Sequence, residues 1–223
     1  MRHAIVIGCL GAVLFASAEP GRAEVNPDAK LLLHLVPAPE GTVPGCYRHH
    51  FTGPEGAVTA GEVGKRYFAY VMIADVDPEE GIAGVQFGVH YDGEEGSGVD
   101  IDSWQECSLY QWHLEDWPSS DTGNLLTWSQ VDDCQRTVPV VVGYFTLYVH
   151  SPDRFQIIPR PVDGLAQVAA CGIKGTNADE KLDVVRSENL GWVEFGGGKG
   201  YNPWDPKQNL LKIQERLKRD ANR

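Results

Sequence analysis

The stretch GIAGVQFGVHYDGEEG, residues 81–96, decides the fold class. Apolar side chains alternate with small or polar ones as far as residue 91, and an Asp-Gly turn follows. The apolar members of the alternation are Ala83, Val85, Phe87, Val89 and Tyr91. Successive side chains of a strand point to opposite faces, so this pattern predicts a β-strand with one buried face.

Similar short segments recur along the chain between turns rich in glycine and proline, with little helical periodicity before residue 205. We expect strands at 31–36, 67–74, 81–91, 124–130, 138–150, 155–158 and 165–170. This spacing predicts a mainly β protein, an antiparallel β-sandwich of jelly-roll-like architecture. Residues 93–120 are acidic and rich in tryptophan, and we expect them to form one long connection.

The N-terminus predicts export from the cytoplasm. Arg2 precedes an apolar run at 4–16, and small residues then offer cleavage after Ala18 or Ala23, of which we prefer Ala23. The run is shorter than a membrane span and has the form of a secretory signal peptide. Residues 1–23 are therefore predicted to be a signal peptide, and the mature protein is predicted to be secreted or periplasmic.

The mature chain is strongly acidic. Residues 24–223 carry 17 Lys and Arg against 30 Asp and Glu, a formal net charge of −13. Such a surface repels nucleic acid and anionic lipid, and it suits cations or neutral ligands such as sugars. No later apolar stretch reaches the roughly 18 residues of a transmembrane helix, so we expect no membrane insertion after cleavage.

Four cysteines remain after cleavage, namely Cys46, Cys107, Cys134 and Cys171. An even number in an exported chain predicts two disulfides, while a zinc site would need ligands paired at short spacing. Three pairings are possible. We favour Cys107–Cys134 with Cys46–Cys171, because the nearer pair brackets one local excursion of the chain.

The C-terminal segment has a different character from the sandwich predicted at residues 24–190. Residues 191–223 contain a glycine-rich spacer, with a tight turn or hinge at 196–198, and then an amphipathic helix predicted at 206–221. Leu210, Ile213 and Leu217 recur at helical spacing, and basic residues gather toward the end. We expect this apolar stripe to dock on the sandwich or on a partner, and the acidic body favours docking on the chain's own sandwich.

Two strands resemble those of a known family. Residues 81–87, GIAGVQF, with the Tyr91-Asp92 ending, resemble the early strands of bacterial cohesin-like modules and their carbohydrate-binding relatives. Residues 143–149, GYFTLYV, resemble a later strand of the same modules. The resemblance spans residues 30–172 and implies a nine-stranded, jelly-roll-like sandwich that binds a ligand without catalysis.

Carboxylates cluster in a glycine-rich turn after the opening strand. Asp92, Glu94, Asp100 and Asp102 offer the closely spaced oxygen ligands and pliable backbone that Ca²⁺ requires, although the spacing is not that of an EF-hand. The sequence therefore raises a calcium site as one hypothesis and a solvated acidic loop as the other.

Aromatic residues supply the candidate ligand site. Tyr110, Trp112 and Trp117 lie within the long acidic connection, and exposed aromatic rings stack on sugars or contact proteins. Trp104 and Trp128 flank expected strands and are more typical of core residues. We expect Trp112 or Trp117 to be exposed and predict a glycan or an extracellular protein as the ligand.

Evidence for catalysis is slight. Glu106, Glu115 and Asp116 could supply the carboxylate pair of a polysaccharide hydrolase, but acidic pairs are common in so acidic a chain. The sequence lacks the G-x-S-x-G turn of a nucleophilic serine. The sequence therefore predicts a secreted binding or structural module, with a secreted polysaccharide-acting hydrolase as the alternative.

Overall fold

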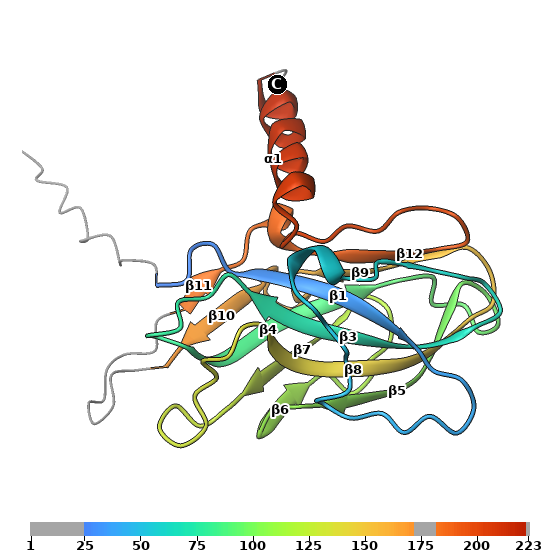
Figure 1. Cartoon of the computed structure of the whole chain (residues 1–223), viewed down its shortest axis with the longest axis horizontal. Coiled ribbons are helices and arrows are strands. Elements are labelled where there is room, and N and C mark those ends of the chain that lie inside the picture. The colour runs from blue at the N-terminus through green and yellow to red at the C-terminus, as the bar shows by residue number, and fades with distance from the viewer. Residues whose placement is uncertain (1–24, 172–181, 222–223) are drawn as a thin grey trace, which may run out of the picture.

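The protein is a β-sandwich with one C-terminal helix, described here from a computed structural model over residues 25–171 and 182–221 (Figure 1). The predicted signal peptide lies outside the described residues. The elements are β1 (Lys30–Pro37), η1 (Pro54–Gly56), β2 (Ala60–Gly61), β3 (Arg66–Ala74), β4 (Ile82–His90), β5 (Val99–Glu106), β6 (Tyr110–His113), β7 (Thr122–Thr127), β8 (Val140–Val149), β9 (Asp153–Ile158), β10 (Gln167–Ala170), β11 (Leu182–Val184), η2 (Ser187–Asn189), β12 (Trp192–Phe195) and α1 (Pro206–Asp220).

The first sheet has the strand order β1-β3-β8-β5, and every pairing in it is antiparallel. β3 and β8 are its central strands, and β3 is buried on both faces from Tyr67 to Ala74. One face of this sheet lies on the sandwich core, and the other faces outward.

The second sheet branches at β4, the strand that the opening pattern predicts. β7 pairs with one side of β4 along most of its length, and β6 pairs with β7. On the other side, β10 and then β11 extend the sheet from the first half of β4, while β9, β12 and β2 extend it from the second half. The mainly β, antiparallel sandwich predicted from the sequence is confirmed.

The core between the sheets is built from the alternating side chains. Val85, Phe87 and Val89 of β4 meet Phe145 of β8 and Phe155 of β9, all at most 3% exposed. The rings of Phe145 and Phe155 lie 5.0 Å apart in an edge-to-face arrangement. Burying such side chains contributes roughly 1.5–3 kcal/mol each, which makes this row the main anchor of the two sheets.

The outer face of the first sheet is covered by the chain itself. The segment 38–59, which we call the flap, lies over a second cluster that includes Phe68, Tyr70, Met72 and Tyr144. Phe51 of the flap packs on this cluster, and Cys46 of the flap bonds covalently to Cys107 at the end of β5. The flap is therefore a structural cover fastened at its middle.

The two disulfides are Cys46–Cys107 and Cys134–Cys171, with Cα–Cα distances of 5.8 and 6.0 Å. The favoured pairing of Cys107 with Cys134 and of Cys46 with Cys171 is wrong. The reason is the sheet: Gln135 and Ala170 both pair with Ile82, so the cysteines next to them meet there. Two disulfides indicate an oxidising, extracellular type of location.

The long connection predicted at 93–120 contains two strands, β5 and β6. β5 is an edge strand whose register with β8 shifts between Ile101 and Ser103, which leaves Asp102 as an unpaired bulge residue. The bulge and the polar side chains of an edge strand interrupt the alternation that would have revealed it. β12 pairs with β9 and β2, so the sandwich continues beyond the predicted boundary at residue 190.

Helix α1 begins at Pro206, as predicted, and its N-cap residue Asp205 accepts a hydrogen bond of 2.9 Å from the Lys207 N–H. The helix extends away from the sandwich (Figure 1). Leu210 and Leu217 are each 56% exposed, so the predicted packing of this stripe on the chain's own sandwich is wrong. Within the described residues, no helix has the length and apolar character needed to cross a membrane.

Candidate functional site

The outer face of the second sheet carries the candidate site, because its strand register lines up apolar side chains there. Val85, Phe87 and Leu126 point inward, so their sequence neighbours point outward. Cross-strand partners then form two outward rows over β6, β7, β4, β10 and β11. The rows are Tyr110–Thr127–Gly84–Ala169–Leu182 and Trp112–Leu125–Gln86–Gln167–Val184, and we call these ten residues the β6–β11 face.

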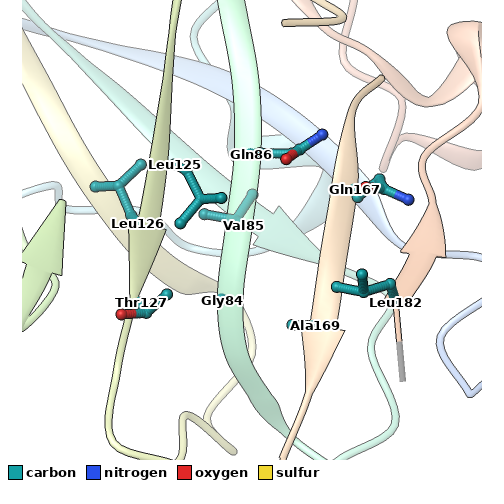
Figure 2. Close-up of a pocket in the computed structure, with 9 residues that line it drawn as sticks. All are labelled: Gly84, Val85, Gln86, Leu125, Leu126, Thr127, Gln167, Ala169 and Leu182. Carbon is teal, nitrogen blue, oxygen red and sulfur yellow. The ribbon is translucent and has the colours of Figure 1, made fainter. Parts of the chain in front are cut away.

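A shallow depression lies in the middle of this face. Its volume is about 160 Å³, and Figure 2 shows Leu125, Thr127, Ala169 and Leu182 around it. Gly84 and Ala169 leave the floor low because their side chains are absent or small. A Cβ added at Gly84 would lie 3.2 Å from the Leu126 carbonyl oxygen and 3.4 Å from the Ala169 Cβ, so a larger residue would fill the depression.

Apolar side chains stand exposed around the depression. Tyr110 and Trp112 of β6 are 59% and 56% exposed, and Leu182 and Val184 of β11 are each 47% exposed. Exposed apolar side chains gathered on one sheet face mark binding sites more often than scattered single residues do.

Tyr110 and Trp112 form a pair, because residues two apart on a strand share a face. Their ring centroids lie 6.2 Å apart with an interplanar angle of 38°. The predicted exposure of Trp112 is confirmed, and Tyr110 stands beside it.

Trp117, the alternative to Trp112 in this prediction, is not exposed. The side chain is 8% exposed and packs edge-to-face against Phe87 at 5.8 Å and Trp104 at 5.5 Å. Trp117 lies in the turn between β6 and β7, and its ring belongs to the core between the sheets. Trp128 is also buried, and Trp104 packs against the core, as expected.

One polar side chain of the β6–β11 face, Gln86, is held in place by hydrogen bonds. The Gln86 Nε2 donates hydrogen bonds to the Asp163 carboxylate at 3.2 Å and to the Leu165 carbonyl at 3.4 Å. Hydrogen bonds from Arg160 hold the pKa of Asp163 below its ordinary value, so that carboxylate is charged and already paired. The residues that line the depression include no carboxylate.

The carboxylates of the predicted calcium site do not all face the same loop. Asp92 and Asp100 turn back on their own loop, where Asp92 accepts from the Ser97 hydroxyl and Asp100 from the Gly96 N–H. The Asp102 carboxylate instead forms an ion pair with Arg66 of β3. Glu94 takes part in the loop through its backbone, whose N–H donates to the Asp92 carboxylate. Asp100 also lies 2.7 Å from the His150 Nε2.

Asp153 of β9, which the sequence did not single out, braces this loop. Its carboxylate accepts hydrogen bonds from the backbone N–H groups of Asp92 and Val99. Burial raises the pKa of Asp153, against the lowering effect of these hydrogen bonds. Within residues 25–171 and 182–221, the structure places no three His, Cys, Asp or Glu side chains in a group that could hold a metal ion.

Comparisons with known proteins add a likeness of fold. No family model matches the chain, and no curated protein matches it either. Among solved structures, a cohesin module of a family 33 glycoside hydrolase from Clostridium perfringens is 11% identical with a TM-score of 0.42, covering 75% of this chain and 98% of the module. The sixth cohesin of scaffoldin B from Acetivibrio cellulolyticus, solved with a dockerin, is 12% identical with a TM-score of 0.44, covering 75% and 99%.

A third structure, a cohesin of ScaC from Acetivibrio cellulolyticus in complex with the ScaB dockerin, is 15% identical with a TM-score of 0.40, covering 62% of this chain and 94% of the cohesin. The predicted resemblance to cohesin modules is confirmed as a weak similarity of fold.

Proposed function

We propose that the protein is a non-catalytic binding module, secreted or periplasmic, whose β6–β11 face takes an apolar segment of a protein partner. The observation that carries this proposal is the gathering of exposed Tyr110, Trp112, Leu182 and Val184 around one depression. Apolar surface of this kind is costly to leave in water and becomes favourable when a partner covers it.

A peptide-selection experiment tests this proposal. Random 15-residue peptides displayed on phage are selected on the wild-type protein and then assayed against Leu182→Glu, which places a charge at the rim of the depression. We expect Leu182→Glu to abolish binding of the selected peptides, while Val43→Glu, on the flap and 62% exposed, leaves it unchanged. Selected peptides that bind both variants equally would refute the assignment of this face.

A glycan is the second candidate ligand, favoured by the ring pair of Tyr110 and Trp112. Sugars stack on aromatic rings, and Thr127 and Gln167 could offer hydrogen bonds nearby. A glycan array separates the two candidates. Binding that is lost in Trp112→Ala but kept in Leu182→Glu would support the glycan, whereas an array without binding supports the protein ligand.

Calcium stabilisation remains a proposal for the loop at 92–100. Asp92 and Asp100 are the two predicted ligands that turn back on this loop, and Asp153 lies against it. Bound Ca²⁺ at a hundredfold its dissociation constant would add about 2.7 kcal/mol to the stability. Equal melting temperatures in a chelator and in millimolar Ca²⁺ would show that the loop is only solvated.

A further inference from the structure

Helix α1 is attached to the sandwich by a polar ridge. The Asn209 side chain donates to the Glu188 carbonyl at 3.5 Å, the Lys212 Nζ lies 4.7 Å from the Trp192 ring centroid, and Arg216 pairs with Glu188. These helical residues are three and four positions apart and therefore share one side of the helix. The side of α1 that contacts the sandwich is thus its polar side.

The apolar stripe of α1 points elsewhere. An α-helix rotates by about 100° per residue. The middle of the stripe formed by Leu210, Ile213 and Leu217 therefore lies about a quarter turn around the helix from the polar ridge. Leu210 and Leu217 are more than half exposed, and Ile213 is partly exposed. The helix is about 22 Å long and extends from the sandwich, so this stripe is open to a partner (Figure 1).

Charge indicates which partner suits this stripe. Residues 206–223 carry 6 basic against 2 acidic residues, a net charge of +4, whereas residues 24–205 carry 11 against 28, a net charge of −17. The helix is therefore attracted to the body of another copy of the chain. An anionic membrane fits less well, because binding there would bring the acidic body against a surface of the same sign.

We propose that α1 of one copy docks its Leu210–Ile213–Leu217 stripe on the β6–β11 face of a second copy. The depression beside Gly84 and Ala169 has a volume of about 160 Å³, enough for one aliphatic side chain. Leu182 lines it, and the exposed Trp112 is the cross-strand neighbour of Leu125 on its other side. This inference rests on the proposed function, since it names the partner of the same face.

The two surfaces differ, so the contact is heterologous and each copy has one donor helix and one acceptor face. Repetition of such a contact gives open chains unless the rotation closes a ring. One helix on one sheet face buries about 1,000 Å² in total, at the low end of specific interfaces, so we expect association at on the order of micromolar concentrations.

Sedimentation velocity between about 1 and 200 μM tests the proposal. The wild-type protein should show an average mass that rises with concentration and falls in about 1 M salt, which screens the opposite charges. The double variant Leu210→Glu/Leu217→Glu and the face variant Leu182→Glu should each remain monomeric alone. The matched control is Leu211→Glu, which is on the same helix, is 61% exposed before substitution, and lies outside the stripe.

The decisive sample is the mixture of the two monomeric variants. The helix variant keeps an intact face and the face variant keeps an intact helix, so they should form a 1:1 heterodimer that grows no further. A mixture that stays monomeric, or a wild-type protein that is monomeric at 200 μM, overturns the inference. The inference is also overturned if the wild-type protein stays monomeric and binds vesicles containing about 30% phosphatidylserine, because the partner of the stripe would then be a membrane.

The outcomes also separate this inference from the proposed function. If the wild-type protein is monomeric but selected peptides still bind in a manner that Leu182→Glu abolishes, the face is a binding site for another protein. If neither association nor peptide binding depends on Leu182, the β6–β11 face is not a binding site.

Discussion

Lowering the pH from about 7.5 to about 5 should loosen the flap over the first sheet, because His34 can hold the flap only as a neutral ring. His34 is 3% exposed on β1, and its Nε2 lies 2.8 Å from the His49 carbonyl oxygen. Its Nδ1 accepts a hydrogen bond of 3.0 Å from the Val58 N–H. A neutral Nε2–H ring satisfies both partners, whereas a protonated ring would set one N–H against another.

The sign and size of the effect follow from the pKa of His34. Burial lowers this pKa from its usual value near 6.5, more strongly than the hydrogen bond to His49 raises it, and the charges of His49 and His50 lower it further. The unfolded state therefore takes up a proton first as the pH falls. The stability conferred by neutral His34 is complete above pH 6.5, declines as the pH falls from there, and stops declining below the folded pKa.

One proton changes the free energy of unfolding by about 1.4 kcal/mol per pH unit, so this site alone can remove up to about 2 kcal/mol between pH 6.5 and pH 5. Burial also lowers the pKa of His49, which acts in the same direction. The Cys46–Cys107 bond tethers the middle of the flap, so we expect local opening on either side of residue 46.

Amide hydrogen exchange, corrected for the intrinsic effect of pH, measures this opening in residues 38–59. We expect faster exchange at pH 5 in the wild-type protein and a much smaller change in His34→Gln, whose amide can still donate to the His49 carbonyl but does not titrate. His113→Gln, at an exposed position at the end of β6, is the matched control and should behave like the wild-type protein. If His34→Gln shows the full wild-type pH effect, His34 does not hold the flap.

Three further predictions concern stability. Replacing Cys46 and Cys107 together by serine should lower the free energy of unfolding by about 4 kcal/mol, because the bond spans 61 residues; an unchanged urea midpoint would contradict this. Phe145→Ala, at a fully buried position, should cost about 3–5 kcal/mol in the same assay, and a loss below 1 kcal/mol would show that the core is not centred there. Glu188→Gln should speed amide exchange in α1 while the central sheet amides stay protected, and equal protection would mean that the ion pair does not hold the helix.

Strands with a regular alternation of buried side chains were predictable, whereas the bulged strand β5 and the short strand β6 were not. The alternation at 81–91 identified β4, whose inward residues make the core. β5 is an edge strand of the first sheet, and the bulge at Asp102 shifts its alternation by one residue. β6 has only four residues, too few for a period of two to stand out.

The disulfide pairing depended on contacts that no sequence spacing reveals. Cys134 and Cys171 are brought together by Ile82, which pairs with residues next to both of them. Cys46 reaches Cys107 because the flap crosses the outer face of the first sheet. Sequence proximity favoured a bond within one excursion, whereas the sheets join segments that are far apart.

The candidate site was predictable only in part for a related reason. Aromatic composition identified Tyr110 and Trp112, but the same composition selected Trp117, which the following turn returns to the core. Gly84 and Leu182 carry no chemical signal of their own. They join the site because the register of β4, β10 and β11 sets them in one row.

A sandwich of two sheets has two outer faces, and this chain treats them differently. The outer face of the first sheet is covered by the flap, with a disulfide and buried hydrogen bonds to His34 that fix the cover in place. The outer face of the second sheet keeps Tyr110 and Trp112 more than half exposed. Because both faces carry aromatic side chains, composition alone would make either one a binding site. The covalent fastening of one cover assigns that face to stability, and the exposed apolar rows of the other make the β6–β11 face the better candidate for binding.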